Sequence, residues 1–145
     1  MKYTIDTNLY IDAVRDPATE TALSEFLEQF GPLTYLHAAV IQELRAGART
    51  TAQADALEHG IFVRFERVGR CFSPSVAAFK ECGRILVDLW RTDGVPFPQR
   101  PRSLVNDILI AASCRESGVT LITADGDYDL IAPHLKGFRH ILPWP

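Results

Sequence analysis

Lys-Tyr-Thr-Ile-Asp-Thr-Asn, at residues 2–8, joins a short strand to the beginning of a helix. Its first four residues favour β structure, and the three polar residues that follow are of the types that begin helices, so we expect a buried strand that ends at Asp6. A short helix should come next, with Leu9, Ile11 and Val14 as its apolar positions. The chain therefore opens with a strand and a helix, and an acidic side chain stands at their junction.

Strands and helices continue to alternate along the rest of the chain. Short apolar runs predict further strands, and apolar residues at helical spacing predict helices between them. The expected strands are residues 33–36, 61–65, 119–123 and 139–142, and the expected helices are residues 19–30, 38–48, 52–58, 73–90, 103–117 and a short one around Tyr128. Such alternation favours a central parallel sheet flanked by helices on both faces. We therefore predict the α/β class, with a single domain over residues 1–145.

Composition sets limits on the class of protein. A chain of 145 residues, 47% of them hydrophobic, is long enough for one core and short for two. No segment approaches the roughly 20 apolar residues that a membrane helix needs, and Asp6 interrupts any signal-peptide pattern. We expect no membrane association and a cytoplasmic location. The cysteines Cys71, Cys82 and Cys114 are odd in number and widely spaced, which favours buried thiols over a disulfide framework or a zinc site.

Charge is unevenly distributed along the sequence. The formal net charge is −3, yet residues 45–102 contain ten Lys or Arg residues against six Asp or Glu residues. A local basic surplus of this kind can contact phosphates without a basic protein overall, although solvated helix faces produce the same pattern. Within this region, Arg100 and Arg102 are candidates to hold the phosphate backbone of a nucleic acid, with a solubilising loop charge as the alternative.

Four acidic residues are expected to meet at one edge of the sheet. Ligands of open α/β sheets bind beyond the carboxyl ends of the strands. Asp6 and Asp125 follow predicted strands, and Glu43 lies in the second turn of the helix after the second strand. Asp107 lies near the start of a helix that precedes a strand, so this helix runs antiparallel to the sheet and begins at the same edge. The topology therefore places all four carboxylates on one rim.

A cluster of carboxylates requires a compensating charge. Two like charges about 4 Å apart repel by roughly 4 kcal/mol at an effective dielectric constant of about 20. Mg²⁺ and Mn²⁺ prefer oxygen ligands, and such ions activate water for attack at phosphorus. Phosphodiester hydrolysis is therefore the indicated chemistry. Taken singly, each acid also has a structural interpretation: Asp6 and Asp125 as helix caps and Glu43 as a solvated helix residue.

Four segments of the sequence resemble the PIN domain, and within it the VapC-type toxins. Residues 3–9 resemble the opening strand with its first acid, and residues 40–44 the helix of the second acid. Residues 106–112 resemble the helix of the third acid, and residues 121–128 the segment of the fourth. The resemblance implies a metal-dependent endoribonuclease that forms a homodimer and serves as the toxin of a type II toxin–antitoxin pair, inhibited by a cognate antitoxin.

The resemblance also implies roles for individual residues. Asp6, Glu43 and Asp107 would hold Mg²⁺ or Mn²⁺, and Asp125 would hold the same ion or a second one, with Asp127 able to share or replace that role.

Three neighbouring polar residues suit the support of these ligands. Thr7, Asn8 and Thr123 are placed to orient the carboxylates by hydrogen bonds, and helix capping is the alternative interpretation.

Other functions remain open at this point. A phosphatase of the haloacid-dehalogenase kind also has a nucleophilic Asp after its first strand, but it requires a second Asp where this chain has Asn8. A catalytically silent PIN-like module would bind RNA or protein without cutting it. A PIN nuclease of RNA processing would cut RNA without acting as a toxin.

Overall fold

Five strands form one parallel sheet in the computed structural model, which describes residues 1–145. The sheet order is β3-β2-β1-β4-β5, so the first strand lies at the centre. The strands are β1 (Lys2–Ile5), β2 (Thr34–His37), β3 (Cys71–Phe72), β4 (Val119–Ile122) and β5 (His140–Ile141). The predicted α/β class with a parallel sheet is confirmed.

The register of the sheet aligns the ends of its central strands. Ile5 of β1 lies opposite Ile122 of β4, and Tyr3 of β1 lies opposite Thr34 of β2. All four residues of β4 are buried, as expected for a parallel strand covered on both faces. The carboxyl ends of β1 and β4 therefore reach the same edge side by side.

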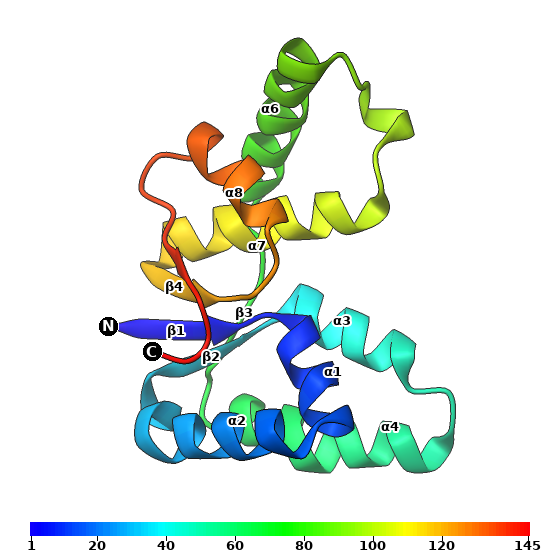
Figure 1. Cartoon of the computed structure of the whole chain (residues 1–145), viewed down its shortest axis with the longest axis vertical. Coiled ribbons are helices and arrows are strands. Elements are labelled where there is room, and N and C mark those ends of the chain that lie inside the picture. Colours follow the sequence, from blue (N-terminus) through cyan, green and yellow to red (C-terminus); the bar gives the residue numbers. More distant parts are fainter.

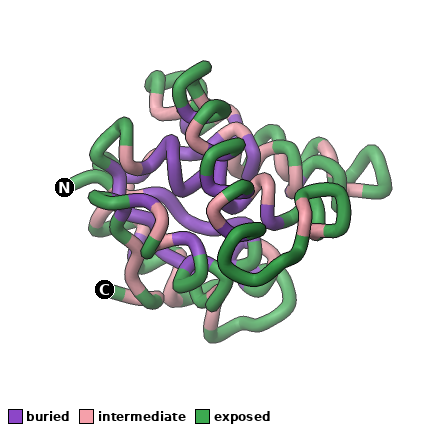
Figure 2. The backbone as a smooth tube through the Cα atoms, turned by 90° about the horizontal axis from the view of Figure 1, so that it is seen from above, coloured by how far each residue is buried: buried purple, intermediate pink, exposed green.

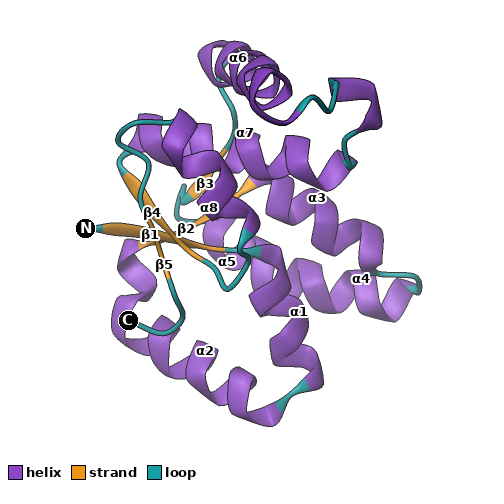
Figure 3. Ribbon diagram, turned by 45° about the horizontal axis from the view of Figure 1, so that its top comes forward, coloured by secondary structure: helices purple, strands orange, loops and turns teal.

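Helices cover both faces of the sheet. They are α1 (Thr7–Arg15), α2 (Pro17–Phe30), α3 (Ala38–Gly47), α4 (Thr51–Leu57), α5 (Val63–Glu66), α6 (Val76–Asp93), α7 (Arg102–Ser117) and α8 (Asp127–Ile131). Figure 1 shows α6, α7 and α8 on one side of the strands and α1, α2 and α4 on the other, and Figure 3 shows the same layers from a tilted view. α3 lies at the carboxyl edge of the sheet, where it contacts both α1 and α7.

One hydrophobic cluster joins these layers. It includes Ile5, Leu36 and Ile122 from the sheet and Ile108 from α7, all of them fully buried. Figure 2 shows the buried segments in the middle of the molecule, with exposed turns around them. α7 contributes more buried residues than any other helix, which identifies it as the helix most deeply enclosed by its neighbours.

The strand predicted at residues 61–65 is wrong. This segment is helical, with a π-helical turn at Glu58–Phe62 followed by α5, and the sheet instead gains β3 further along the chain. The alternation of Ile61, Val63 and Phe65 suggested a strand, but the buried side chains are Phe62 and Phe65. A spacing of three residues places both on one face of a helix.

Two further expectations concern cysteines and membranes. None of the three cysteines forms a disulfide; Cys82 and Cys114 are buried and Cys71 is partly buried. No helix has both the length and the apolar character needed to cross a lipid bilayer.

Burial in α7 leads to a stability prediction. Ile110→Ala should lower the free energy of unfolding by about 2–5 kcal/mol, because Ile110 is fully buried and the lost methyl groups leave a cavity. Val14→Ala, at a position 87% exposed in α1, should change it by no more than about 0.5 kcal/mol. Urea unfolding followed by circular dichroism measures both values, and equal effects would contradict the assigned core.

Candidate metal centre

Asp6 stands where β1 ends and α1 begins. Its backbone N–H donates to the carbonyl oxygen of Ile122 at 3.0 Å, which extends the pairing of β1 with β4 by one residue. The side chain is only 4% exposed and caps α1, with Oδ1 accepting from the backbone N–H of Thr7 at 2.8 Å. The strand and the helix therefore fix this carboxylate from both directions.

Two threonine hydroxyls connect Asp6 to its neighbours. Thr123, which directly follows β4, donates from Oγ1 to Asp6 Oδ2 at 2.7 Å. Thr7 donates from Oγ1 to Glu43 Oε1 on α3 at 3.1 Å. Hydrogen bonds thus link the first acid to the second, and β1 to the end of β4.

The segment after β4 continues this network. Thr123 Oγ1 accepts from the backbone N–H of Asp125 at 3.0 Å, and Asp125 Oδ1 accepts from the backbone N–H of Asp127 at 2.9 Å. These bonds fold the segment into a turn that brings Asp125 and Asp127 toward α7. Asp125 is half-buried and Asp127 is exposed, so the turn borders solvent.

Asp107 approaches the same point from α7. Its side chain is 7% exposed, and one carboxylate oxygen each from Asp107, Asp125 and Asp127 lie within 4.8 Å of one another. Oδ1 of Asp107 accepts from the buried hydroxyl of Tyr128 at 3.3 Å. The antiparallel course of α7 thus delivers its acid to the carboxyl edge.

Burial and mutual repulsion disfavour the charged forms of these acids. Burial raises the pKa of Asp107 to about 7, and the carboxylates of Asp6, Asp125 and Glu43 add to the shift. Burial also raises the pKa of Asp6, although its hydrogen bonds from Thr123 and Thr7 act in the opposite direction. The pKa of Glu43 is raised mainly by burial and further by Asp6, with the Thr7 bond opposing the shift.

The donor set fits a hard divalent cation. It consists of carboxylate oxygens alone, and it is open to solvent on the side of Asp127. Mg²⁺ and Mn²⁺ take such oxygens and retain several waters, whereas zinc sites are dominated by His and Cys. A bound cation would also offset the repulsion that raises the pKa of Asp107.

The remaining predicted residues, Asn8, Arg100 and Arg102, differ in their exposure and in their contacts. Asn8 is exposed, and no hydrogen bond joins its side chain to the acids. The guanidinium of Arg100 is engaged with Asp93 and with the carbonyl oxygen of Val95. Arg102 is exposed at the first residue of α7, five positions before Asp107. Arg102 is therefore the more available of the two cations.

Sequence reasoning missed Tyr128 as a member of this cluster. The sequence pattern places it in a short helix at the end of the fourth acidic segment and gives it no role, yet its hydroxyl reaches Asp107 across 21 residues of sequence. The available signal was a hydroxyl-bearing ring at an apolar position of the fourth acidic segment. A phenol buried there needs a polar partner.

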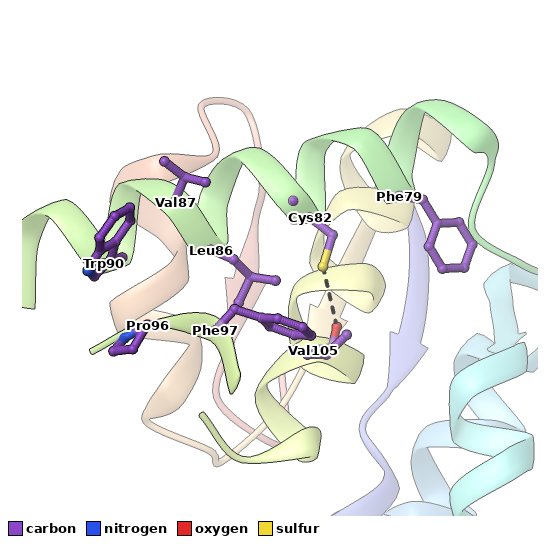
Figure 4. Close-up of a pocket in the computed structure, with 9 residues that line it drawn as sticks. Phe79, Cys82, Leu86, Val87, Trp90, Pro96, Phe97 and Val105 are labelled. Carbon is purple, nitrogen blue, oxygen red and sulfur yellow. Dashed lines mark hydrogen bonds between the residues drawn. The ribbon is translucent and has the colours of Figure 1, made fainter. Parts of the chain in front are cut away.

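An apolar cavity lies outside the acidic cluster. It encloses about 560 Å³ between α6, α7 and the turn at Phe97–Gln99, and Figure 4 shows its apolar lining. The thiol of Cys82 donates to the carbonyl oxygen of Val105 at 3.9 Å, and burial raises the pKa of this thiol. The lining contains no carboxylate or imidazole, and the raised pKa of Cys82 disfavours the thiolate that would act as a base or a metal ligand.

The fold and the acidic rim define an α/β protein with a cluster of carboxylates at the carboxyl edge of a parallel sheet. The PIN domain family model matches residues 3–132, and the chain belongs to the PIN domain family. No curated protein matches the sequence of the chain.

Several experimental structures share this fold. A DNA-bound VapBC from Salmonella typhimurium aligns with a TM-score of 0.71 at 19% identity, covering 98% of both chains. FitAcB from Neisseria gonorrhoeae aligns with a TM-score of 0.69 at 20% identity, again over 98% of both chains. VapBC-1 from nontypeable Haemophilus influenzae aligns with a TM-score of 0.66 at 20% identity over 97% of each chain. At these identities the similarity concerns the fold.

Asp107 should make the metal-free protein less stable as the pH rises. The folded state keeps the Asp107 proton up to about pH 7, whereas the unfolded state releases it near the ordinary pKa of 3.8. The folded state thus binds more protons between these values, and the free energy of unfolding falls through this window. Between about pH 5.5 and about pH 8, we expect a loss of roughly 1–3 kcal/mol from this group.

Urea unfolding at both pH values, in the presence of a chelator, measures this loss. Asp107→Asn should flatten the dependence, because the amide does not titrate. Asp12→Asn, at an exposed position of α1, is the matched control and should retain the wild-type dependence. An Asp107→Asn slope equal to that of wild type would contradict the assignment.

Proposed function

We propose that residues 1–145 act as one domain with Mg²⁺- or Mn²⁺-dependent endoribonuclease activity, and that the protein is the toxin of a toxin–antitoxin pair. The observation that carries the proposal is the approach of carboxylate oxygens of Asp107, Asp125 and Asp127 to within 4.8 Å of one another, on a rim that is open to solvent at Asp127. Membership of the PIN domain family supports a nuclease. The resemblance of the sequence to VapC-type toxins supports the RNA substrate and the toxin role.

We assign the metal ligands to the four predicted acids. Asp6, Glu43 and Asp107 hold the ion, and Asp125 holds it or a second ion. Asp127 is an additional ligand candidate, since one of its carboxylate oxygens lies within 4.8 Å of oxygens of both Asp107 and Asp125. Thr7 and Thr123 orient Asp6 and Glu43 through the hydrogen bonds described above.

The reaction that fits this cluster is hydrolysis of a phosphodiester. A bound Mg²⁺ or Mn²⁺ supplies positive charge that stabilises an in-line displacement at phosphorus. A carboxylate of the rim accepts a proton from the attacking water. The phosphorus–oxygen bond to the 3′-oxygen then breaks, and the leaving 3′-oxygen takes up a proton from solvent, which gives a 5′-phosphate on one product and a 3′-hydroxyl on the other. The phosphate approaches from the exposed side of Asp125 and Asp127.

A protein partner is part of the proposal. The VapC-type resemblance implies a cognate antitoxin and a homodimer. Phe79, Trp90 and Phe97 line the apolar cavity and are each more than half exposed. Exposed apolar side chains gathered in this way are typical of protein–protein interfaces, which supports association with a partner.

Loss of a single carboxylate tests the nuclease proposal. Asp6→Asn keeps the shape of the side chain and removes its charge, so induced expression of this variant should no longer arrest growth. Purified Asp6→Asn should cleave RNA at least about 100-fold more slowly than wild type, and a chelator should abolish wild-type cleavage until Mg²⁺ is restored. Sequencing of RNA 5′-phosphate ends locates the cut sites.

Asp12→Asn provides the control for this experiment. Asp12 is an exposed acid on the same helix as Thr7, and its replacement should leave growth arrest and cleavage unchanged. Wild-type protein that binds RNA without producing new ends would favour the silent binding module. Cleavage without growth arrest would favour RNA processing.

Arg102 is expected to contact the RNA backbone. Arg102→Ala should weaken RNA binding and reduce the slope of log affinity against log salt by about 1, as expected for one lost phosphate contact. Arg100→Ala should leave this slope unchanged, because the Arg100 side chain already pairs with Asp93. Fluorescence anisotropy at several salt concentrations, with the Asp6→Asn background to prevent cleavage, distinguishes the two. Equal slopes for wild type and Arg102→Ala would remove Arg102 from the interface.

A further inference from the structure

Tyr128 carries a hydroxyl group that its aromatic packing does not require. The side chain is fully buried in α8, and its ring centroid lies 6.0 Å from that of Phe138 and 6.3 Å from that of His140. A phenylalanine would supply the same aromatic contacts. The additional hydroxyl has one partner, Oδ1 of Asp107, at 3.3 Å. What distinguishes tyrosine from phenylalanine here is therefore its contact with the acidic rim.

Asp107 depends on this hydroxyl more than the other acids depend on any single donor. Asp6 accepts from both the backbone of Thr7 and the hydroxyl of Thr123. Glu43 and Asp125 are buried less deeply and accept from Thr7 and from the backbone of Asp127. Asp107 is buried, and Tyr128 is its single side-chain hydrogen-bond donor.

We infer that Tyr128 is a positioning residue for Asp107: its hydroxyl holds Oδ1 and leaves Oδ2 free to bind a divalent cation. The inference rests on the proposed metal-dependent function, since it requires a cation at the acidic rim. Tyr128 itself acts through Asp107 and is no ligand.

The hydrogen bond between Tyr128 and Asp107 also connects two elements of the site. Tyr128 belongs to the segment that carries Asp125 and Asp127, whereas Asp107 belongs to α7. Its hydrogen bond therefore ties the acid of α7 to the segment of the other two. Without this bond, the Asp107 carboxylate gains rotational freedom about its side-chain torsions, and cation binding must restrict that freedom again. Cation affinity should fall as a result.

Tyr128→Phe removes the hydroxyl and keeps the buried ring. In the full-length protein, calorimetric titration with Mn²⁺ should give a dissociation constant about 10- to 100-fold higher than that of wild type, the range typical for loss of a group that orients a metal ligand. The far-ultraviolet circular dichroism and the melting temperature of the metal-free variant report whether the fold is retained.

Tyr10 offers a matched control. It is also buried, at 4% exposed, and its hydroxyl has no hydrogen-bond partner. Tyr10→Phe therefore deletes a buried hydroxyl of the same kind in α1, away from the acids. Its Mn²⁺ affinity should equal that of wild type, so a difference between the two variants isolates the contact with Asp107.

A second readout separates positioning from general damage. The Mn²⁺ concentration that gives half-maximal RNA cleavage should rise for Tyr128→Phe by the same factor as the dissociation constant, and saturating Mn²⁺ should restore the rate. If Tyr128→Phe binds Mn²⁺ as tightly as wild type, or if saturating Mn²⁺ does not restore its rate, the inference is overturned and the nuclease proposal stands. If wild type itself binds no Mn²⁺, the metal-dependent function fails and the inference falls with it.

Discussion

Repulsion among buried carboxylates is the constraint around which the edge of the sheet is organised. Asp6 and Asp107 are almost fully buried, and Asp6, Glu43 and Asp125 together help to raise the pKa of Asp107 to about 7. Such a cluster costs free energy in the metal-free protein. Hydroxyl and backbone donors from Thr7, Thr123 and their neighbours offset part of this cost by stabilising the charged forms. A bound divalent cation would offset the rest of this free-energy cost.

The register of the central strands makes this cluster possible. Because Ile5 lies opposite Ile122, the residues that follow them, Asp6 and Thr123, reach the sheet edge together and form a hydrogen bond of 2.7 Å. A shift of one residue in this pairing would turn the side chain of Thr123 to the other face of the sheet. The apolar core that fixes the register therefore also fixes the geometry of the acids.

The placement of Asp6, Glu43, Asp107 and Asp125 at one edge was predictable from sequence. In a parallel sheet, the carboxyl ends of the strands and the first turns of the connecting helices lie at the same edge. The helical segment at residues 58–66 was not predictable, since three alternating apolar residues fit a strand as well as they fit a short helix. Tyr128 was missed for a different reason. Its contact with Asp107 depends on how α8 packs against α7, and a long-range side-chain contact leaves no periodic pattern in the sequence.

The acidic residues also differ in solvent exposure, and this difference affects how a polyanion reaches them. Asp6 and Asp107 lie at the buried end, Asp125 is half-buried, and Asp127 is exposed. Under the proposed function, a bound divalent cation would reduce the negative charge that an RNA phosphate meets at this rim, and the exposed Arg102 at the start of α7 adds positive charge on the helix that carries Asp107. A net charge of −3 is therefore compatible with an RNA substrate, because the local field at the rim, rather than the total charge, governs the encounter.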